Sequence, residues 1–364
     1  MHLYQRPDAG LPFDSTRTSL SGDAEDVSFG KFGGNMVHFQ TSYQRQSPGF
    51  EVNDLGYLRR ANQQSFSNWM GMNFSKPTKL YRRMNGNFNV WSYWTAAGLP
   101  TERALNTNWH VNFTNNWWLN TGATLSQLPG TYCDNCARGG PAFRRSPFLN
   151  LNLGVQGDDR RHVVPSVFVG GGRGDYGASH YVTVETEVEL IPMSQLQLEI
   201  EAEWTINHDD SQWFGNFREG TATRYAFALL DQETRSLGVR ASYTATPTLS
   251  FQLYAAPFLS RGRYTNPREL SGTPRATRYE ERYTPYTPPS GASYGFDVLD
   301  LRSNSVLRWE FLPGSTVFAV WTHGRGGDAY DPRYPDRTWR REYGDLFGLH
   351  PANTFLVKVA YFLD

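Results

Sequence analysis

The sequence predicts an all-β fold, an antiparallel up-and-down β-barrel of about 14 strands. Three observations lead to this prediction. Apolar and polar residues alternate along most segments, which is the period of a strand, and no convincing helical period emerges. Pro, Gly, Asn and Asp separate these segments. Short connections then alternate with long ones, as in a barrel with tight turns on one rim and long loops on the other.

The alternating segments follow one another along the whole chain. The polar positions of residues 104–114 are filled largely by asparagine, and those of 195–214 largely by glutamate. The alternation of residues 223–244 continues through a polar middle, so we expect one long strand there. The fourteen expected strands are residues 35–45, 64–75, 79–94, 104–114, 116–126, 148–156, 162–170, 180–191, 195–214, 223–244, 248–260, 303–312, 315–325 and 354–363.

The remaining segments are expected to be connections. Fourteen strands place both chain ends on the short-turn side of the sheet. The expected long loops are residues 46–63, 95–103, 127–147, 171–179, 215–222, 261–302 and 326–353.

Composition limits the class of protein. The chain has 364 residues, a net charge of zero and a mean hydropathy of −0.57, so it forms either two ordinary domains or one large β domain. Zero net charge leaves no basic footprint, and we expect no nucleic-acid partner. No run of about 18 apolar residues exists, which excludes a transmembrane helix.

Two further features favour a membrane barrel over a soluble sandwich. Several strands carry long apolar strips on one side, and the opposite side is too polar for a packed core. Aromatic residues make up 15% of the chain and often fall near strand ends, where aromatic belts form. These residues are Trp109, Phe113, Trp117, Trp204, Tyr243, Trp309, Trp321 and Tyr361.

The predicted location is therefore the outer membrane of a Gram-negative bacterium, with outer-membrane lipid as a partner. Residues 35–364 form the barrel, and residues 1–34 form an N-terminal extension that is periplasmic or supplies additional strands. The first residues lack the apolar core of a signal peptide, so the chain is a mature or truncated product, or else cytosolic. The competing interpretation is a large soluble β protein with a solvated polar face.

Four separated motifs resemble a bacterial family. They are SPGFEVNDLGYLRRA (47–61), TPTLSFQLYAAPFLSRGRY (246–264), LRSNSVLRWEFLPGSTVFAVW (301–321) and PANTFLVKVAYF (351–362). They are similar to the C-terminal barrel of proteins classed as domain of unknown function 5916, often fused to an N-terminal family-9-type carbohydrate-binding module that this chain lacks. The resemblance implies an outer-membrane barrel without an established activity. Because the family usually carries further strands before the segment that matches residues 30–45, the resemblance leaves two expectations open. Either this chain is the C-terminal part of a larger barrel, whose further strands come from residues 1–34, a missing segment or a partner, or the sheet closes at fourteen strands.

An acidic row is the main candidate site. Glu185 and Glu187 share one side of their strand, as do Glu199 and Glu201 on the next, and a turn centred near Met193 places Glu187 opposite Glu199. Like charges across a ladder are destabilising unless arginines, cations or water compensate them, and a barrel lumen offers all three. The residues expected to line the lumen and contact a solute are Glu185, Glu187, Glu199, Glu201, Arg240, Arg308, Glu310, Asn108 and His110.

These residues leave three interpretations open: a solvated lumen wall, a selectivity or solute-contact surface, and a catalytic carboxylate pair. His110 is expected to be a polar wall residue and not a metal ligand. Two cysteines do not close a zinc site, so Cys133 and Cys136 are expected to form a loop disulfide, with free thiols or a redox pair as alternatives. A G-x-G-x-x-G match at 172–177 precedes a strand, so we expect no dinucleotide cofactor.

The sequence therefore predicts a porin-like barrel, and not an enzyme, that passes or binds a hydrophilic solute. The family's fused carbohydrate-binding module suggests that this solute is glycan-related. One alternative is a non-conducting scaffold or surface-attachment barrel whose lumen is filled by residues 261–302. A further alternative is a soluble β-rich carbohydrate-active enzyme. In the terminal strand we expect Lys358 to face the lumen, because a charge facing lipid at mid-depth costs about 2–4 kcal/mol, and Val357 and Val359 to face lipid.

Overall fold

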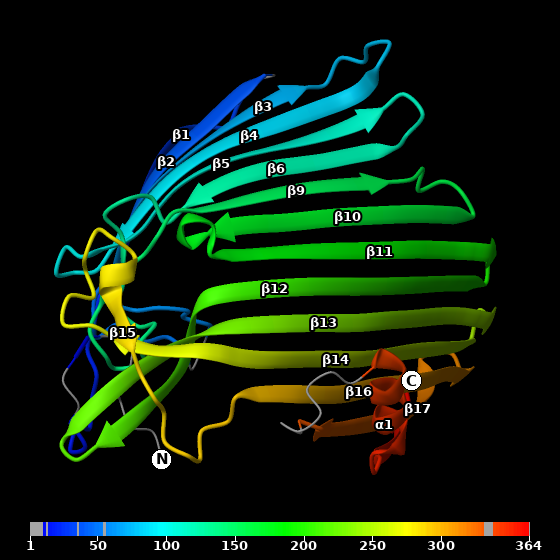
Figure 1. Ribbon diagram of the computed structural model, residues 1–364. Coiled ribbons are helices and arrows are strands. Elements are labelled where there is room, and N and C mark those ends of the chain that lie inside the picture. The colour runs from blue at the N-terminus through cyan, green and yellow to red at the C-terminus, as the bar shows by residue number, and fades with distance from the viewer. Residues whose placement is uncertain (1–9, 12–13, 35, 54–55, 331–337, 364) are drawn as a thin grey trace.

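One antiparallel sheet makes up most of the protein (Figure 1). The computed structural model describes residues 10–11, 14–34, 36–53, 56–330 and 338–363. Neighbouring strands follow chain order except where short elements intervene. The strands of the path are β1 (Ala24–Lys31), β2 (Val37–Gln46), β3 (Gln63–Phe74), β4 (Tyr81–Trp94), β5 (Pro100–Phe113), β6 (Trp118–Ser126), β9 (Phe148–Gln156), β10 (Val163–Gly174), β11 (Ser179–Met193), β12 (Leu196–Glu219), β13 (Ala222–Thr246), β14 (Leu249–Leu270), β16 (Gly295–Leu312), β17 (Ser315–Asp328) and β18 (Ala352–Ala360).

The fourteen strands expected from the alternation are all present, because β-branched and aromatic residues with period two suit a pleated, half-exposed surface. β1 is an additional strand within the N-terminal extension, and it pairs with β2 along its whole length. β1 begins on the long-loop side, where the Ser47 amide donates to the Asp23 carbonyl (2.9 Å). The sheet therefore starts on the long-loop side, whereas the fourteen expected strands place its start on the short-turn side; the N-terminal end itself lies outside the described residues.

Several expected loops are strand instead. β12 continues to Glu219, past its expected end at residue 214, and meets β13 in a two-residue turn at 220–221, where Gly220 has φ +61°. That left-handed conformation suits the tight turn of a twisted hairpin and favours glycine. β14 and β16 likewise extend into the expected loop 261–302, which leaves 271–294 as the connection. Polar strand ends lack the apolar alternation, so the pattern underestimates the strand length.

Short elements occupy the remaining connections. β7 (Tyr132–Cys133) pairs with β8 (Phe143–Arg144), and β15 (Tyr283–Pro285) pairs with β14. The 3-10 turns η1 (Asp175–Gly177) and η2 (Glu280–Arg282) lie at the long-loop end. η1 falls in the glycine-rich segment between β10 and β11, so that segment is a hairpin connection.

The ladder register divides the sheet into two faces. The apolar face carries Val188 of β11, Ile200 of β12 and Val239 of β13, which lie in one cross-strand row. The polar face carries the alternate residues, among them Glu199 and its partner Arg240. The same parity holds across the middle of the sheet because the β-bulges lie beside the turns or in the long-loop half of the strands.

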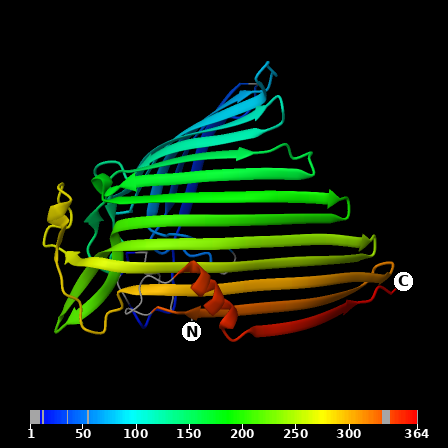
Figure 2. The ribbon, with the colours of Figure 1, turned by 45° about the vertical axis from the view of Figure 1, so that its right-hand side comes forward.

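A helix, α1 (Trp339–Gly348), corrects the expectation of an all-strand chain. It lies across β16 and β17 (Figure 2), and its Leu346 packs with Leu259, Leu299 and Leu301 on the apolar face. One side of α1 is formed by Trp339, Tyr343 and Leu346, which have helical spacing. The sequence therefore contains a helical apolar pattern here, but a short one.

A group of polar and aromatic side chains holds α1 on the apolar face; we call Glu233, Arg235, Arg261, Trp204 and Trp339 the Glu233 cluster. The Glu233 carboxylate accepts hydrogen bonds from the indole nitrogens of Trp204 (2.8 Å) and Trp339 (3.1 Å). It also pairs with Arg235 (3.0 Å) and Arg261 (2.8 Å). Both guanidinium groups lie over the Trp339 ring, at 4.2 and 4.4 Å from its centroid.

The sheet is strongly curved (Figures 1 and 2). Its edges within the described residues are β1, which pairs with β2, and β18, which pairs with β17. Closure of the sheet is therefore not observed among these residues, and neither fourteen strands nor β1 supplies it. Among the described residues, no helix is long and apolar enough to cross a membrane.

Candidate functional site

The polar face brings all the expected solute-contact residues onto one side of the sheet. His110 begins a row of cross-strand neighbours that passes through Asn120, Gly154 and Phe168 to Glu185. Asn108 lies in the adjacent row of the same face, two residues away along β5. The side chains of the amide-rich and the acidic segments therefore lie on the same face of the sheet, although more than 70 residues separate the two segments in sequence.

The acidic row is confirmed, but its expected register is wrong by two residues. Glu185 lies opposite Glu203, Glu187 opposite Glu201, and Glu189 opposite Glu199. The turn centres at 194–195 and not at Met193, because a β-bulge between Leu190 and Met193 shifts the last pair. A shift of two leaves every side chain on its expected face, so six glutamates still form three adjacent like-charge pairs.

Few cations compensate this row. Arg240 pairs with Glu199 (2.5 Å). Among the described residues, no ion pair or hydrogen bond joins the carboxylates of Glu185, Glu187 or Glu201 to another side chain. The centre of the polar face is thus an acidic surface that attracts cations or polar solutes carrying positive charge.

The basic side of the polar face lies near the C-terminus. Arg308, Phe318 and Lys358 are neighbours in one cross-strand row. Arg308 pairs with Glu310 (2.9 Å), whose carboxylate also accepts from the Gly314 amide. Lys358 therefore shares the parity of Arg308, as expected, and Val357 and Val359 have the opposite parity.

An amide network fills the polar face of β3 to β6. The Trp69 indole donates to Asn87 (2.8 Å), Asn87 to Asn108 (2.7 Å), and Asn108 to Asn106 (3.0 Å). Beside it is a groove of about 250 Å³ whose lining includes Trp69 and Trp91. His110 Nδ1 lies 2.6 Å from the Asn120 side-chain oxygen, so the ring has a polar partner on this face. Amides and indoles in one groove suit hydroxyl or peptide contacts.

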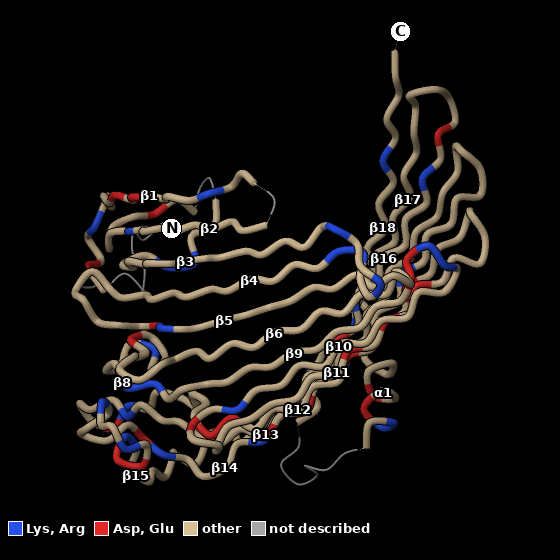
Figure 3. Tube along the Cα trace, turned by 90° about the horizontal axis from the view of Figure 1, so that it is seen from above, with Lys and Arg blue, Asp and Glu red and all other residues tan. Residues whose placement is uncertain are grey.

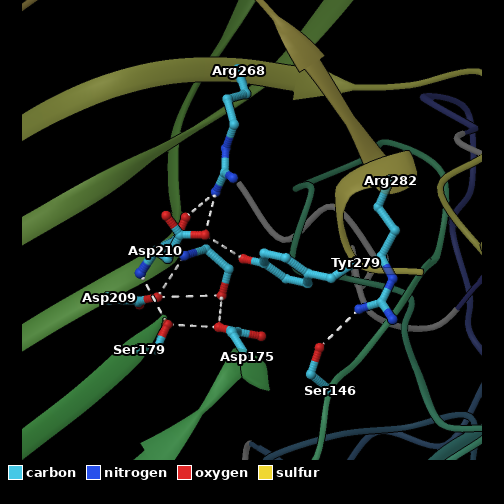
Figure 4. A network of polar contacts seen from close by, with 9 residues as sticks. Ser146, Asp175, Ser179, Asp209, Asp210, Arg268, Tyr279 and Arg282 are labelled. Atoms are coloured by element: carbon cyan, nitrogen blue, oxygen red, sulfur yellow. Dashed lines mark hydrogen bonds and ion pairs between the residues drawn. The ribbon is translucent and has the colours of Figure 1, made fainter. Parts of the chain in front are cut away.

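The long-loop end holds a second polar site that the sequence did not reveal (Figure 4). Here a cavity of about 460 Å³ lies between η1, β11, β12 and β13 on one side and the loops 127–147 and 271–294 on the other. Asp175 accepts from the hydroxyls of Ser179 (2.6 Å) and Ser211 (2.9 Å). The Ser211 amide donates to Asp209 (2.8 Å), so the two carboxylates share one serine. These residues come from three connections or strand ends, and no local sequence pattern links them.

Tyr279 of loop 271–294 and Arg268 of β14 both contact Asp210 beside this site. The Tyr279 hydroxyl donates to the Asp210 carboxylate (2.7 Å), to which Arg268 also donates (3.0 Å). Burial raises the pKa of Tyr279, and it also raises the pKa of Tyr283. Both phenols are therefore neutral donors at physiological pH.

Arg282 connects loops 271–294 and 127–147. Its guanidinium is 1% exposed and donates to the Ser146 hydroxyl (2.9 Å) and to the carbonyls of Arg144 (3.1 Å), Ala276 (2.9 Å) and Thr277 (3.0 Å). The expected disulfide between Cys133 and Cys136 is present, with a Cα–Cα distance of 5.6 Å, and both residues line the cavity. The two loops thus pack as one unit at this end of the sheet.

Charged residues are distributed unevenly between the middle of the sheet and its long-loop end (Figure 3). The middle of β3 to β9 is largely free of charged residues, whereas blue and red segments gather at the loops near β8 and β15. The described residues contain no group of three or more His, Cys, Asp or Glu side chains arranged to hold a metal ion.

The chain matches a known protein family. A family model described as Domain of unknown function (DUF5916) matches residues 12–364. No curated protein matches the chain. Because the match covers nearly the whole sequence, the chain belongs to the DUF5916 family.

Proposed function

We propose that this chain is an integral outer-membrane β-barrel that binds or passes a small hydrophilic solute along its polar face. The observation that carries the proposal is the exposed apolar face. Large apolar side chains lie open on strand after strand, including Leu151 (53% exposed), Val182 (49%) and Val357 (70%). A soluble monomer rarely exposes contiguous apolar patches beyond a few hundred Å², and a lipid bilayer removes that cost.

The limits of the apolar face fit a bilayer. Tyr243, Trp309 and Tyr361 are exposed at the short-turn end. On β12, eight residues separate Leu196 from Trp204, where the Glu233 cluster begins; this is about 26 Å of strand at about 3.3 Å per residue. An outer-membrane barrel has an apolar band about 25 Å tall with aromatic residues at both interfaces. Trp109 and Trp321 lie farther from the strand ends, inside this band.

Closure requires a further pairing. The described path contains fifteen strands, β1 to β6, β9 to β14 and β16 to β18, so β1 and β18 run in the same direction. A wholly antiparallel barrel therefore needs at least one more strand between them, from this polypeptide or from another. Open edges are costly in lipid, so we infer that β1 and β18 are paired in the membrane.

A pair of neighbouring substitutions tests the membrane location. Leu153 lies on the apolar face, and Asn152, its neighbour on β9, lies on the polar face. Leu153→Arg is expected to reduce stability in lipid vesicles by about 2–4 kcal/mol, and Asn152→Arg to have a much smaller effect. Gel mobility that changes with heating reports the folded fraction. Equal effects of the two substitutions, or a stable monodisperse protein without detergent, would refute the membrane location.

Passage of solute is tested by conductance in planar bilayers. The acidic row predicts cation preference, and replacing Glu187 and Glu199 by glutamine is expected to reduce it. The connection 271–294 contacts residues of the loop end, such as Asp210 and Arg144, and so covers one end of the sheet. Well-inserted protein without conductance would therefore support the non-conducting scaffold and refute passage.

A further inference from the structure

The cavity at the long-loop end has walls of opposite charge. Loop 127–147 contributes the arginines Arg138, Arg144 and Arg145 to the lining and no carboxylate. The strand side contributes Asp175 and Asp209 and no lysine or arginine. Acidic and basic side chains of the lining therefore come from different elements, unlike the row of six glutamates in the middle of the polar face.

Both walls carry charges that burial destabilises. Burial raises the pKa of Asp209, despite the hydrogen bonds from Ser211 that lower it. Burial lowers the pKa of Arg145, and the nearby carboxylates of Glu102 and Asp175 act in the opposite direction. A ligand that brings a positive group to the aspartates and a negative group to the arginines relieves both costs at once.

Apolar rings fill the space around the two walls. Trp213, Phe143, Phe227 and Tyr283 line the cavity, and the Arg138 guanidinium lies 3.6 Å from the centre of the Trp213 ring. A volume of about 460 Å³ is within the range of small-molecule sites. The lining thus combines two separated charges with an apolar surface for a side chain.

We propose that this cavity binds a short peptide with free termini, its ammonium group at Asp175 and Asp209 and its carboxylate at Arg144 and Arg145. An apolar side chain of the peptide contacts Trp213 and the neighbouring rings. The site is separate from the acidic row and does not depend on the membrane location, because residues on the sheet and its two loops build it. It assigns the long-loop end a recognition role in addition to any passage along the polar face.

The test is isothermal titration calorimetry of the full chain in detergent with the tripeptide Gly-Phe-Gly. Four forms are compared: free, N-acetylated, C-amidated and blocked at both ends. The free form is expected to bind, each single block to weaken binding at least tenfold, and the double block to abolish it. Equal binding of free and blocked forms would overturn the proposal, as would absence of peptide binding or tighter binding of maltose, an uncharged disaccharide.

Two substitutions test which wall of the cavity binds which terminus of the peptide. Asp209→Asn is expected to remove the penalty for N-acetylation and to preserve that for C-amidation, and Arg144→Gln to have the reverse effect. Asp159→Asn, in the exposed short turn between β9 and β10 and outside the cavity lining, is the matched control and leaves both penalties unchanged. Loss of both penalties together in either variant contradicts the assignment. If a variant fails to fold, as judged by heat-dependent gel mobility, the peptide series on the unaltered chain still decides. A conductance failure bears only on solute passage, and a binding failure only on this site.

Discussion

The substitution Glu187→Gln is expected to stabilise the protein. Glu187 faces Glu201 directly, has Glu199 and Glu203 on the diagonals, and has Glu185 and Glu189 two residues away on its own strand. Replacing one carboxylate by its neutral isostere removes five repulsive pairs and leaves the volume of the side chain nearly unchanged. β10 offers no charge on the other side, since Ser166 is the partner of Glu187 there.

The magnitude follows from the ladder spacing. With about 6 Å to the opposite carboxylate, about 7 Å along the strand and about 8 Å on the diagonals, water dielectric and a screening length of about 8 Å give about 1 kcal/mol in total. At 1 M salt the screening length is about 3 Å, and the same calculation gives about 0.3 kcal/mol. The gain must therefore shrink as salt rises.

The assay is urea-induced unfolding in lipid vesicles at about 0.15 and 1 M salt, with the free energy extrapolated to zero denaturant. Glu310→Gln is the matched control on the same face. Its carboxylate pairs with Arg308 at 2.9 Å, so its loss is expected to be neutral or destabilising. A Glu187→Gln protein that is less stable, or whose gain does not depend on salt, would refute the repulsive row.

Three further predictions concern the loop end and the helix. Arg282→Met removes donors to Ser146 and three carbonyls, so it is expected to cost about 3 kcal/mol and to expose loop 271–294 to limited proteolysis; an unchanged cleavage rate contradicts its role in joining the loops. Leu346→Ala leaves a void against Leu259 and Leu299 and is expected to cost about 2–4 kcal/mol, measured by urea unfolding, with faster hydrogen exchange in α1; unaltered exchange argues against docking of the helix. Burial raises the pKa of Tyr279. Its contribution to the stability of the folded loop is therefore complete below about pH 10 and is lost as the pH rises toward the higher pKa of the folded state. Proteolysis of the loop should therefore accelerate above about pH 10, and less so in Tyr279→Phe; a rate independent of pH contradicts this.

The alternation of side chains was sufficient to predict the strands and their faces. Period two is a local property of the extended chain, so Glu185, Arg240 and Lys358 could be assigned to one face before any partner strand was known. The same reasoning failed where local pattern is weak. The end of β12 beyond residue 214 lacks a regular alternation and α1 spans only ten residues, and packing against Leu259 and Leu299 determines that α1 forms.

The register and the loop cavity depended on tertiary contacts. A bulge near Leu190 set which glutamates face each other, and the sequence signal for a bulge is weak. The cavity unites Arg144, Asp175 and Asp209 from distant parts of the chain. The sequence by itself determined the strands, their two faces and the family motifs, because these follow from local geometry. Only the tertiary structure decided the pairing of charges and the shape of the loop site, because those energies arise between residues far apart in sequence.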